Sequence, residues 1–126
     1  MASWVSWLWG ASGPTQPLRP IDAAHDPALR FHFLSLLDNT EPPDVFKASE
    51  VAQLLTHAEL AKLGYETWRE AIPAIRELAF ELRGVGYCEI LRKGKVLGDE
   101  VDLLDVDGPI RIRRVHQYTS KLNDDW

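Results

Sequence analysis

The fold is decided by residues 67–84, which read Thr67-Trp-Arg-Glu-Ala-Ile-Pro-Ala-Ile-Arg-Glu-Leu-Ala-Phe-Glu-Leu-Arg-Gly84. Apolar residues recur in this stretch in steps of four, three, four and three: Trp68, Ile72, Ile75, Ala79 and Leu82. That spacing predicts one amphipathic helix, which Thr67 and Glu70 begin as a capping box and the closing glycine ends. Pro73 removes one intrahelical hydrogen bond, so we expect a kink or a break near Arg69–Ala71.

An earlier helix is predicted to begin at Asp26-Pro27. An aspartate carboxylate can accept hydrogen bonds from the N–H groups of the first turn, and a proline in that turn has no N–H to leave unpaired. The apolar face of this helix is formed by residues at helical spacing: Leu29, Phe33 and Leu36 or Leu37. The segment from Asn39 to Asp44, which contains Pro42-Pro43, ends the helix.

The segment between these two helices predicts a short strand and further helix. Val45-Phe46-Lys47 is the extended candidate. Ser49 is interpreted as the N-cap of a helix whose inward residues are Val51, Leu54 and Leu55. Residues His57–Leu63 continue that helix or form a short separate one, and Gly64 ends it.

The last part of the chain changes to the alternating pattern of strands. We expect strands at Tyr87–Lys93 and Pro109–Val115, the second with Ile110 and Ile112 alternating with Arg111 and Arg113. The long connection from Gly94 to Gly108 holds an acidic cluster: Asp99, Glu100, Asp102, Asp105 and Asp107. Three helices followed by such a hairpin predict an α+β fold, a winged helix with a three-helix helix-turn-helix core and a C-terminal β-hairpin wing.

The chain has the length of one domain, which an arm precedes. We expect an N-terminal arm over residues 1–20, a winged-helix domain over 21–118 and a C-terminal tail over 119–126. The arm carries three indoles: Trp4, Trp7 and Trp9. Since burial of one indole is worth about 2–3 kcal/mol, three exposed ones would be unusual. The arm folds back over an apolar groove of its own domain, docks on a partner or second copy, or lies on a membrane surface.

The composition favours an intracellular protein, in the cytoplasm or nucleus. Cys88 is the one cysteine and cannot form an intrachain disulfide, which suits a reducing compartment. No apolar run approaches the roughly 20 residues that span a bilayer, and the first residues lack the basic start of a secretory signal. The net charge of −5 disfavours a non-specific polyanion binder unless basic residues gather on one face.

No catalytic or metal-binding motif is recognised in the sequence, so we expect neither an enzyme nor a cofactor. The four histidines lack metal-ligand spacing: His25, His32, His57 and His116. A structural zinc site needs four nitrogen or sulfur ligands, and the chain offers one thiol. Cys88, with His116 nearby as a conceivable base, is interpreted as a half-buried strand residue and not as a nucleophile.

Several short motifs occur together in the chain: Ser49-Glu-Val-Ala-Gln, Trp68-Arg, Pro73-Ala-Ile-Arg-Glu-Leu-Ala79, Gly86, Arg92-Lys-Gly94 and Gly108-Pro-Ile-Arg-Ile-Arg113. Together they resemble the family catalogued as domain of unknown function 3253, over residues 28–114. The resemblance implies a winged-helix-like fold and supplies no catalytic residues, because the family has no assigned biochemical role. The chain departs from shorter members at His57–Tyr65, at Asp99–Asp107 and in its arm.

Two binding functions follow from these features. The first is protein–protein interaction through the winged-helix domain and the arm, including a homodimer, with Trp4, Trp7 and Trp9 as partner-binding candidates. The alternative is binding of DNA or RNA through the third helix and the basic hairpin. The residues that would meet phosphate in that case are Arg69, Arg76, Arg92, Lys93, Lys95, Arg111 and Arg113.

The charges of the hairpin leave two arrangements open. If the strands pair, six basic residues form one cationic patch: Arg92, Lys93, Lys95, Arg111, Arg113 and Arg114. The acidic residues of the connection would instead neutralise these arginines if the loop folded onto them. The third helix raises a similar question, because its arginines alternate with glutamates, a pattern typical of a solvated face.

Overall fold

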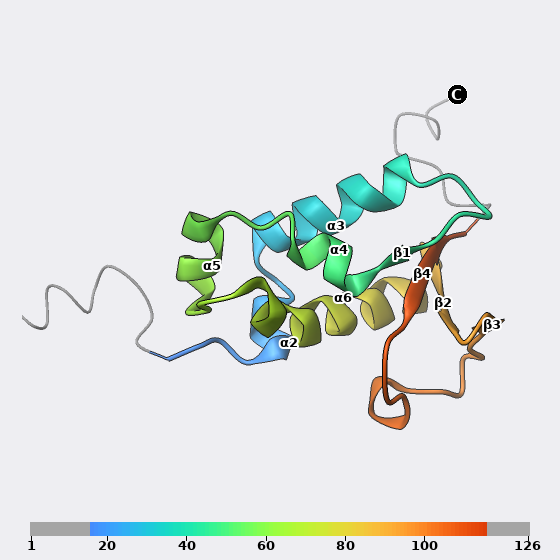
Figure 1. The fold of residues 1–126 in the computed structure, drawn as a ribbon. Helices are drawn as coiled ribbons and strands as arrows, with labels where there is room; N and C mark the ends of the chain where they lie inside the picture. The colour runs from blue at the N-terminus through green and yellow to red at the C-terminus, as the bar shows by residue number, and fades with distance from the viewer. Residues whose placement is uncertain (1–15, 116–126) are drawn as a thin grey trace, which may run out of the picture.

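The computed structural model describes residues 16–115, which form an α+β fold (Figure 1). Within this range the five α-helices are α2 (Pro20–Ala23), α3 (Pro27–Asn39), α4 (Ala48–Ala52), α5 (His57–Leu63) and α6 (Ile72–Gly84). Two 3₁₀ turns are η1 (Trp68–Ala71) and η2 (Leu103–Asp105). The four strands are β1 (Phe46–Lys47), β2 (Cys88–Arg92), β3 (Lys95–Val96) and β4 (Arg111–Arg114). In Figure 1 the strands gather at the right-hand end of the helices.

The four strands form one antiparallel sheet in the order β1-β4-β2-β3. Ile112 of β4 lies opposite Phe46 of β1 on one side and opposite Ile90 of β2 on the other. All three side chains are at most 1% exposed, because this face of the sheet joins the hydrophobic core. The short strand predicted at 45–47 and the two later strands are therefore confirmed, while the pairing of the last strand with β1 was not predicted.

Helix α6 is the centre of the core. Of the predicted stripe, Ile75, Ala79 and Leu82 are buried, whereas Trp68 and Ile72 are partly buried against the core. Ala74 and Leu78 complete the buried face. The expected break is present, since η1 precedes α6 and Pro73 lies in the first turn, where no N–H is needed. Only one of the two hydrogen bonds of the capping box forms. Glu70 Oε2 accepts from the Thr67 N–H at 2.9 Å, whereas the Glu70 N–H donates to the Thr67 carbonyl and not to its hydroxyl.

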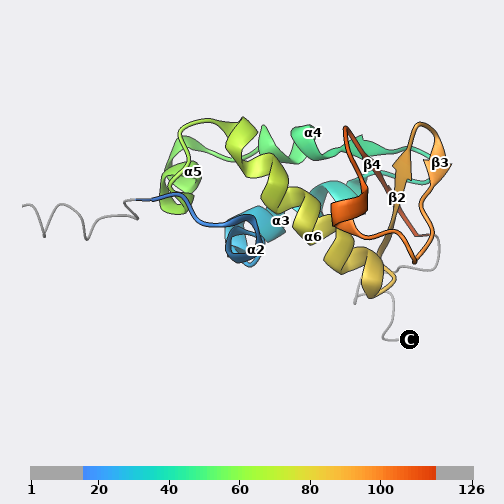
Figure 2. The same ribbon diagram turned by 90° about the horizontal axis from the view of Figure 1, so that it is seen from below.

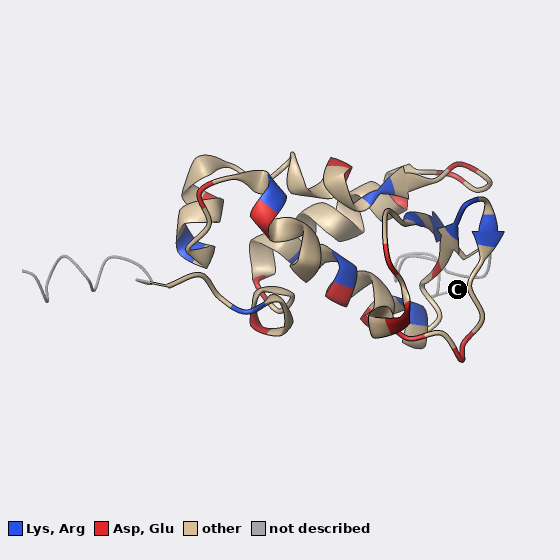
Figure 3. Ribbon diagram, turned by 60° about the horizontal axis from the view of Figure 1, so that its bottom comes forward, with Lys and Arg blue, Asp and Glu red and all other residues tan. Residues whose placement is uncertain are grey.

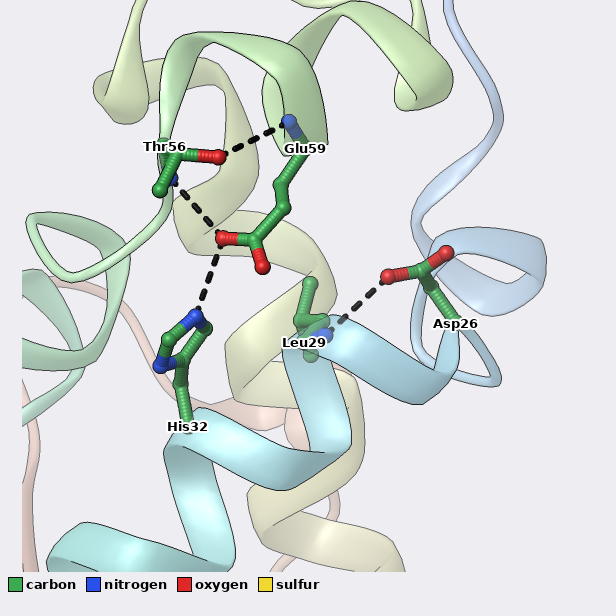
Figure 4. A network of polar contacts seen from close by, with 5 residues as sticks. All are labelled: Asp26, Leu29, His32, Thr56 and Glu59. Carbon is green, nitrogen blue, oxygen red and sulfur yellow. Dashed lines mark hydrogen bonds and ion pairs between the residues drawn. The ribbon is translucent and has the colours of Figure 1, made fainter.

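Helix α3 has the boundaries and the apolar face that the sequence predicts. Asp26 Oδ2 accepts from the Leu29 N–H at 3.0 Å, and so caps the helix (Figure 4). Leu29, Phe33 and Leu37 are fully buried, whereas Leu36 is half-buried. The rings of Phe33 and of Phe46 in β1 meet edge to face, with centroids 5.6 Å apart. Such a pair adds about 1 kcal/mol to the area that it buries.

The start of α4 differs from the prediction. Ser49 lies inside the first turn, and the N-cap is Lys47, whose N–H donates to Glu50 Oε2 at 2.8 Å. The glutamate supplies the cap because β1 runs directly into the helix. Leu54, predicted to point inward, is 46% exposed. The helix ends at Ala52, so helical spacing no longer places Leu54 on the buried face.

Residues 57–63 form a separate helix, α5, which settles the alternative left open by the sequence. The Thr56 hydroxyl accepts from the Glu59 N–H at 3.1 Å, and the Thr56 N–H donates to Glu59 Oε1 at 2.9 Å. Gly64 ends the helix with a left-handed φ of +81°. The N–H of Leu18 donates to the carbonyl of the last helical residue at 2.9 Å, so the first described segment is fixed to α5.

Strand β2 continues through a two-residue turn into β3, which the sequence did not predict. Lys93 and Gly94 have positive φ angles of 53° and 82°, the backbone twist that suits a tight hairpin. After β3 the chain returns across α6 through residues 97–110, which contain η2 and which we call the return loop (Figure 2). The long connection is therefore a short hairpin followed by a loop.

Candidate binding surface

Two arginines of α6 hold the return loop by its backbone. Arg76 donates through Nη1 to the Gly108 carbonyl at 2.7 Å and through Nη2 to the Val106 carbonyl at 2.9 Å. Arg83 donates to the carbonyls of Gly98 at 3.2 Å and Val101 at 2.8 Å. The two arginines are seven residues apart, so they project from one face of the helix. Neither side chain belongs to the solvated face that its neighbouring glutamates suggested.

The return loop and α2 both pack against α6 (Figure 2). Side chains of all three segments line one shallow groove, among them Pro20 of α2, Pro73 and Glu77 of α6, and Leu103 of the loop. Val106 of the loop is only 8% exposed and belongs to the core. A recognition helix enters the major groove through a bare outward face. Helix α6 has Arg76 and Arg83 partly buried beneath the return loop, whereas Pro73 and Glu81 are exposed.

The acidic residues of the return loop do not neutralise the hairpin. The ion pairs of residues 16–115 are Arg19–Asp22, Arg30–Glu81, His32–Glu59, Arg113–Glu89 and Arg114–Glu41. None of them includes a loop carboxylate. Asp105 instead caps η2, accepting from the Asp102 N–H at 3.1 Å. Of the two arrangements left open by the sequence, the loop folds onto α6 and leaves most of the hairpin cations without an acidic partner.

Five basic residues lie at one end of the sheet, and we call them the basic end: Lys47, Arg92, Lys93, Lys95 and Arg111. They come from β1, β2, β3, β4 and the β2–β3 turn, and these strands are neighbours in the sheet. In Figure 3 the blue of Lys and Arg recurs on the strands of the sheet. In the part of the chain that the structure describes, none of the five side chains forms an ion pair or a hydrogen bond.

The register of the sheet sets like charges against each other within the basic end. Lys47 lies opposite Arg111, and Arg92 lies opposite Lys95. Like charges directly opposite each other destabilise an antiparallel pair of strands. The two pairs are offset by one residue, because Arg111 pairs with Leu91 and not with Arg92, so they lie at the same end of the sheet with their side chains on opposite faces. Neither pair benefits the fold, whereas an anion bound to either pair would relieve its repulsion.

The remaining basic residues predicted for nucleic acid have partners elsewhere. Arg113 Nε lies 3.1 Å from Glu89 Oε1. Arg69 lies on η1 with its guanidinium 4.4 Å from the ring centroid of Trp68. Of the seven predicted residues, the structure brings four together at the basic end: Arg92, Lys93, Lys95 and Arg111. Lys47 was missed, because its place depends on a strand pairing that sequence spacing does not reveal.

A groove of about 320 Å³ opens beside the basic end, and we call it the basic groove. Three cations line it, Lys47, Arg76 and Arg111, together with Ser49. Its apolar lining residues are Ala48, Ile72, Pro109 and Ile110. The guanidinium of Arg92 lies so close to Gly108 that a Cβ atom there would come within 2.7 Å of Nη2. Burial and then the neighbouring Arg92 lower the pKa of Arg76, while Asp107 opposes the shift.

The histidine and cysteine side chains with described partners have structural ones. His32 Nε2 of α3 lies 2.9 Å from Glu59 Oε1, which also accepts from Thr56, so the two helices share one polar contact (Figure 4). Cys88 is 2% exposed and its thiol donates to the Ala79 carbonyl at 3.5 Å. Burial raises the pKa of the Cys88 thiol to about 12, so it stays protonated near neutral pH. His116 lies outside the described residues.

Between Gln16 and Val115 there is no group of three or more His, Cys, Asp or Glu side chains that could hold a metal ion. No helix in the same range is long and apolar enough to cross a membrane. The partner-binding candidates Trp4, Trp7 and Trp9 lie outside the described residues.

A family model described as a protein of unknown function, DUF3253, matches residues 26–115. The match spans 90 of the 126 residues, counted from its two bounds, and it confirms the resemblance that the short motifs indicated. It begins at the N-cap of α3 and ends just after β4, so it includes the basic end and the basic groove. No curated protein matches the chain.

Proposed function

The chain belongs to the DUF3253 family, and on that premise we propose that it is a non-catalytic module that binds nucleic acid through the basic end of its sheet. One observation carries the proposal: the like-charge pairs Lys47–Arg111 and Arg92–Lys95 lie at the same end of the sheet and have no carboxylate partner among the described residues. Phosphate oxygens are the anions that Lys and Arg side chains commonly bind in such a row.

The same proposal includes a winged-helix fold. Its support is the order of the elements, α3, β1, α4–α5, α6, β2 and β4, with β4 between β1 and β2 in the sheet. On this interpretation the three helical segments form the helix-turn-helix core. The β2–β3 hairpin, the return loop and β4 form the wing.

Nucleic acid meets the wing and β1 in this proposal, and not the third helix. The engagement of two α6 arginines within the fold supports this choice, because Arg76 and Arg83 already donate to four loop carbonyls. Contacts from the wing and from β1 reach the sugar-phosphate backbone, which carries little sequence information. The module therefore binds with weak sequence preference.

The net charge of −5 agrees with a local binding surface. Affinity then depends on the few cations that meet phosphate, and it falls steeply with salt because counterions are released. With five such contacts, the slope of log K against log salt concentration is about −3.5 for single strands and about −4.5 for duplexes.

Fluorescence anisotropy with labelled single-stranded DNA, RNA and duplex, at salt from about 50 to 200 mM, tests the proposal. The variant Lys93→Gln/Lys95→Gln removes two phosphate contacts, so we expect about tenfold weaker binding and a slope smaller in magnitude by about 2. The matched control Lys62→Gln/Arg69→Gln removes two charges from α5 and η1, away from the basic end. Equal losses in both variants, or no binding at the lowest salt, contradict the proposal.

Protein–protein interaction is the second candidate function, and an apolar groove favours it. This groove of about 550 Å³ lies between α5 and η1, and Leu55, Leu60 and Trp68 contribute to its lining. The first described residues contact the C-terminal end of α5, at Leu63 and Gly64, and α5 also lines this groove. An arm that docks on a partner or a second copy would bring its indoles to such a surface.

Size-exclusion chromatography with light scattering on the intact chain and on a chain without residues 1–15 tests this second candidate. The deletion ends before Leu18, whose N–H and carbonyl bond to α5 and Tyr65, so the described domain is retained. A mass above the monomer that needs residues 1–15 supports self-association. Monomers in both samples count against it.

An intracellular location, cytoplasm or nucleus, belongs to the same proposal. Cys88 is the one cysteine of the chain, and it is buried without an intrachain disulfide partner. A protonated, buried thiol suits a reducing compartment, which is also where a nucleic-acid-binding module meets its ligand.

A further inference from the structure

The basic groove joins two kinds of surface that a simple phosphate site does not need together. Its cations Lys47 and Arg111 stand beside apolar groups of Ile72 and Pro109. Its volume of about 320 Å³ is at the lower end of the range for small-molecule sites. The groove therefore fits a small ligand, or one unit of a polymeric ligand, that has an anionic part and an apolar part.

The donors that remain for a ligand lie on one side of this groove. Lys47 and Arg111 lie opposite each other on β1 and β4, and neither side chain has a partner in residues 16–115. The hydroxyl of Ser49, in the first turn of α4, makes no hydrogen bond within that range. Arg76 adds positive charge, and two of its five N–H groups are already used by loop carbonyls.

A nucleotide satisfies both surfaces of the groove. Inorganic phosphate would leave the apolar lining in water, and an apolar peptide would leave the opposed cations unbalanced. The cations also continue past the groove to Arg92, Lys93 and Lys95, which suits a ligand with a charge on every unit. Bases of a duplex are stacked inside the helix, whereas those of a single strand can turn outward into a protein pocket.

We infer that the basic groove seats one nucleotide of a single strand, with its base on Ile72 and Pro109 and its phosphate between Lys47 and Arg111. The inference rests on the nucleic-acid binding proposed above and names its substrate class. The hydroxyl of Ser49 donates to the same phosphate. The cations of the β2–β3 hairpin follow the backbone beyond the seated nucleotide.

Three probes of the same length distinguish binding of the base from binding of the backbone. They are a mixed-sequence single strand, the same backbone without bases, and a duplex, each labelled and titrated by anisotropy at low salt. We expect the single strand to bind about fivefold tighter than the other two, because only it offers an unstacked base to the groove.

The variant Ser49→Asp places a carboxylate beside the phosphate position. An acidic residue in the first turn of a helix is favourable, so α4 is retained, and thermal unfolding followed by circular dichroism checks this. We expect about tenfold weaker binding of the single strand. The control Gln53→Glu makes the same charge change at the other end of α4, outside the groove, and leaves affinity within about twofold.

The outcomes separate this inference from the proposed function. Equal affinity for all three probes, or equal effects of Ser49→Asp and Gln53→Glu, overturns the nucleotide site while nucleic-acid binding stands. Binding of an acidic, leucine-containing peptide that Ser49→Asp abolishes, without binding of any nucleic acid, overturns both. A preference for the single strand that Ser49→Asp removes supports the site.

Discussion

Arginines serve opposite purposes in two neighbouring regions of this molecule. On α6, Arg76 and Arg83 are bonded to four carbonyls of the return loop. At the basic end, Arg92 and Arg111 face other cations across the strands and have no partner among the described residues. The helix arginines build the fold, whereas the sheet arginines are a cost to it.

The difference shows where a functional surface is to be sought. A basic residue whose donors are used by the fold contributes to stability and has little to offer a ligand. A basic residue that faces a like charge destabilises its strand pair, and a bound anion removes that penalty. Partners within the fold therefore distinguish the two groups better than their position on a helix or a strand does.

The largest expected effect is slow alkylation of the Cys88 thiol, on the side of the molecule where Arg83 of α6 holds the return loop. Cys88 lines a groove there together with Arg83 and with Leu97 of the loop. Because burial raises the thiol pKa to about 12, we expect alkylation by iodoacetamide at neutral pH on the order of a thousandfold slower than for an exposed thiol. Mass spectrometry over time measures the rate, with the urea-unfolded chain as the fast control. Labelling of the folded protein at the rate of the unfolded one would show that the loop does not close this side.

Matched substitutions of one arginine from each region test the comparison most directly. Arg76→Gln leaves at least one loop carbonyl without its charged donor, so the free energy of unfolding in urea should fall by about 2 kcal/mol. Arg111→Gln, at the basic end, should change it by less than about 0.5 kcal/mol. If Arg111→Gln were the more destabilising of the two, the assignment of roles would be reversed.

A smaller change in stability is expected when a like-charge contact of the basic end is removed. Lys47→Gln and Arg111→Gln each relieve the same like-charge contact, so either change should stabilise the fold by about 0.3 kcal/mol at low salt. The double variant should gain little beyond the single ones, and a double-mutant cycle in urea measures this coupling. Additive losses of stability would mean that both side chains have favourable partners in the fold.

The smallest effect is a pH dependence that belongs to neither region. The Thr56 N–H, and next the ring of His32, hold the pKa of the Glu59 carboxyl below its ordinary value of about 4.5. A lowered pKa in the folded state gives stability that is present above that value and is lost as the pH falls below it. Urea unfolding from pH 7 to pH 3 should therefore show a smaller acid loss in Glu59→Gln than in the unaltered chain. Identical pH profiles would exclude this contribution.

The helices were predictable where a local signal exists. Asp26-Pro27 marks the start of α3, and Pro73 marks the break before α6, because both act through the backbone of the adjacent turn. Ser49 and Leu54 were misjudged, since α4 has only five residues and is capped by a glutamate side chain instead. In so short a helix, the spacing of apolar residues spans too few turns to predict which residues are buried.

The site was only half predictable, for a different reason. Four of the cations at the basic end follow from the two strands, but Lys47 joins them through a pairing between the first and last strands. The sequence also shows acidic residues in the loop and basic residues in the hairpin, which makes ion pairs between them plausible. Among the described residues the structure has no such ion pairs, because the loop is held by the arginines of α6 through its backbone carbonyls. Every residue has a carbonyl, so no sequence pattern marks these acceptors.

The measurement that tests the central claim most directly is a titration of the ¹⁵N-labelled chain with a short single-stranded oligonucleotide, followed by amide chemical shifts. We expect the largest changes at residues 47–49, 92–95 and 108–111, with α6 from Glu77 to Leu82 unchanged. Changes concentrated on α6 and η1, with the basic end unaffected, would contradict the claim that the sheet cations form the binding surface.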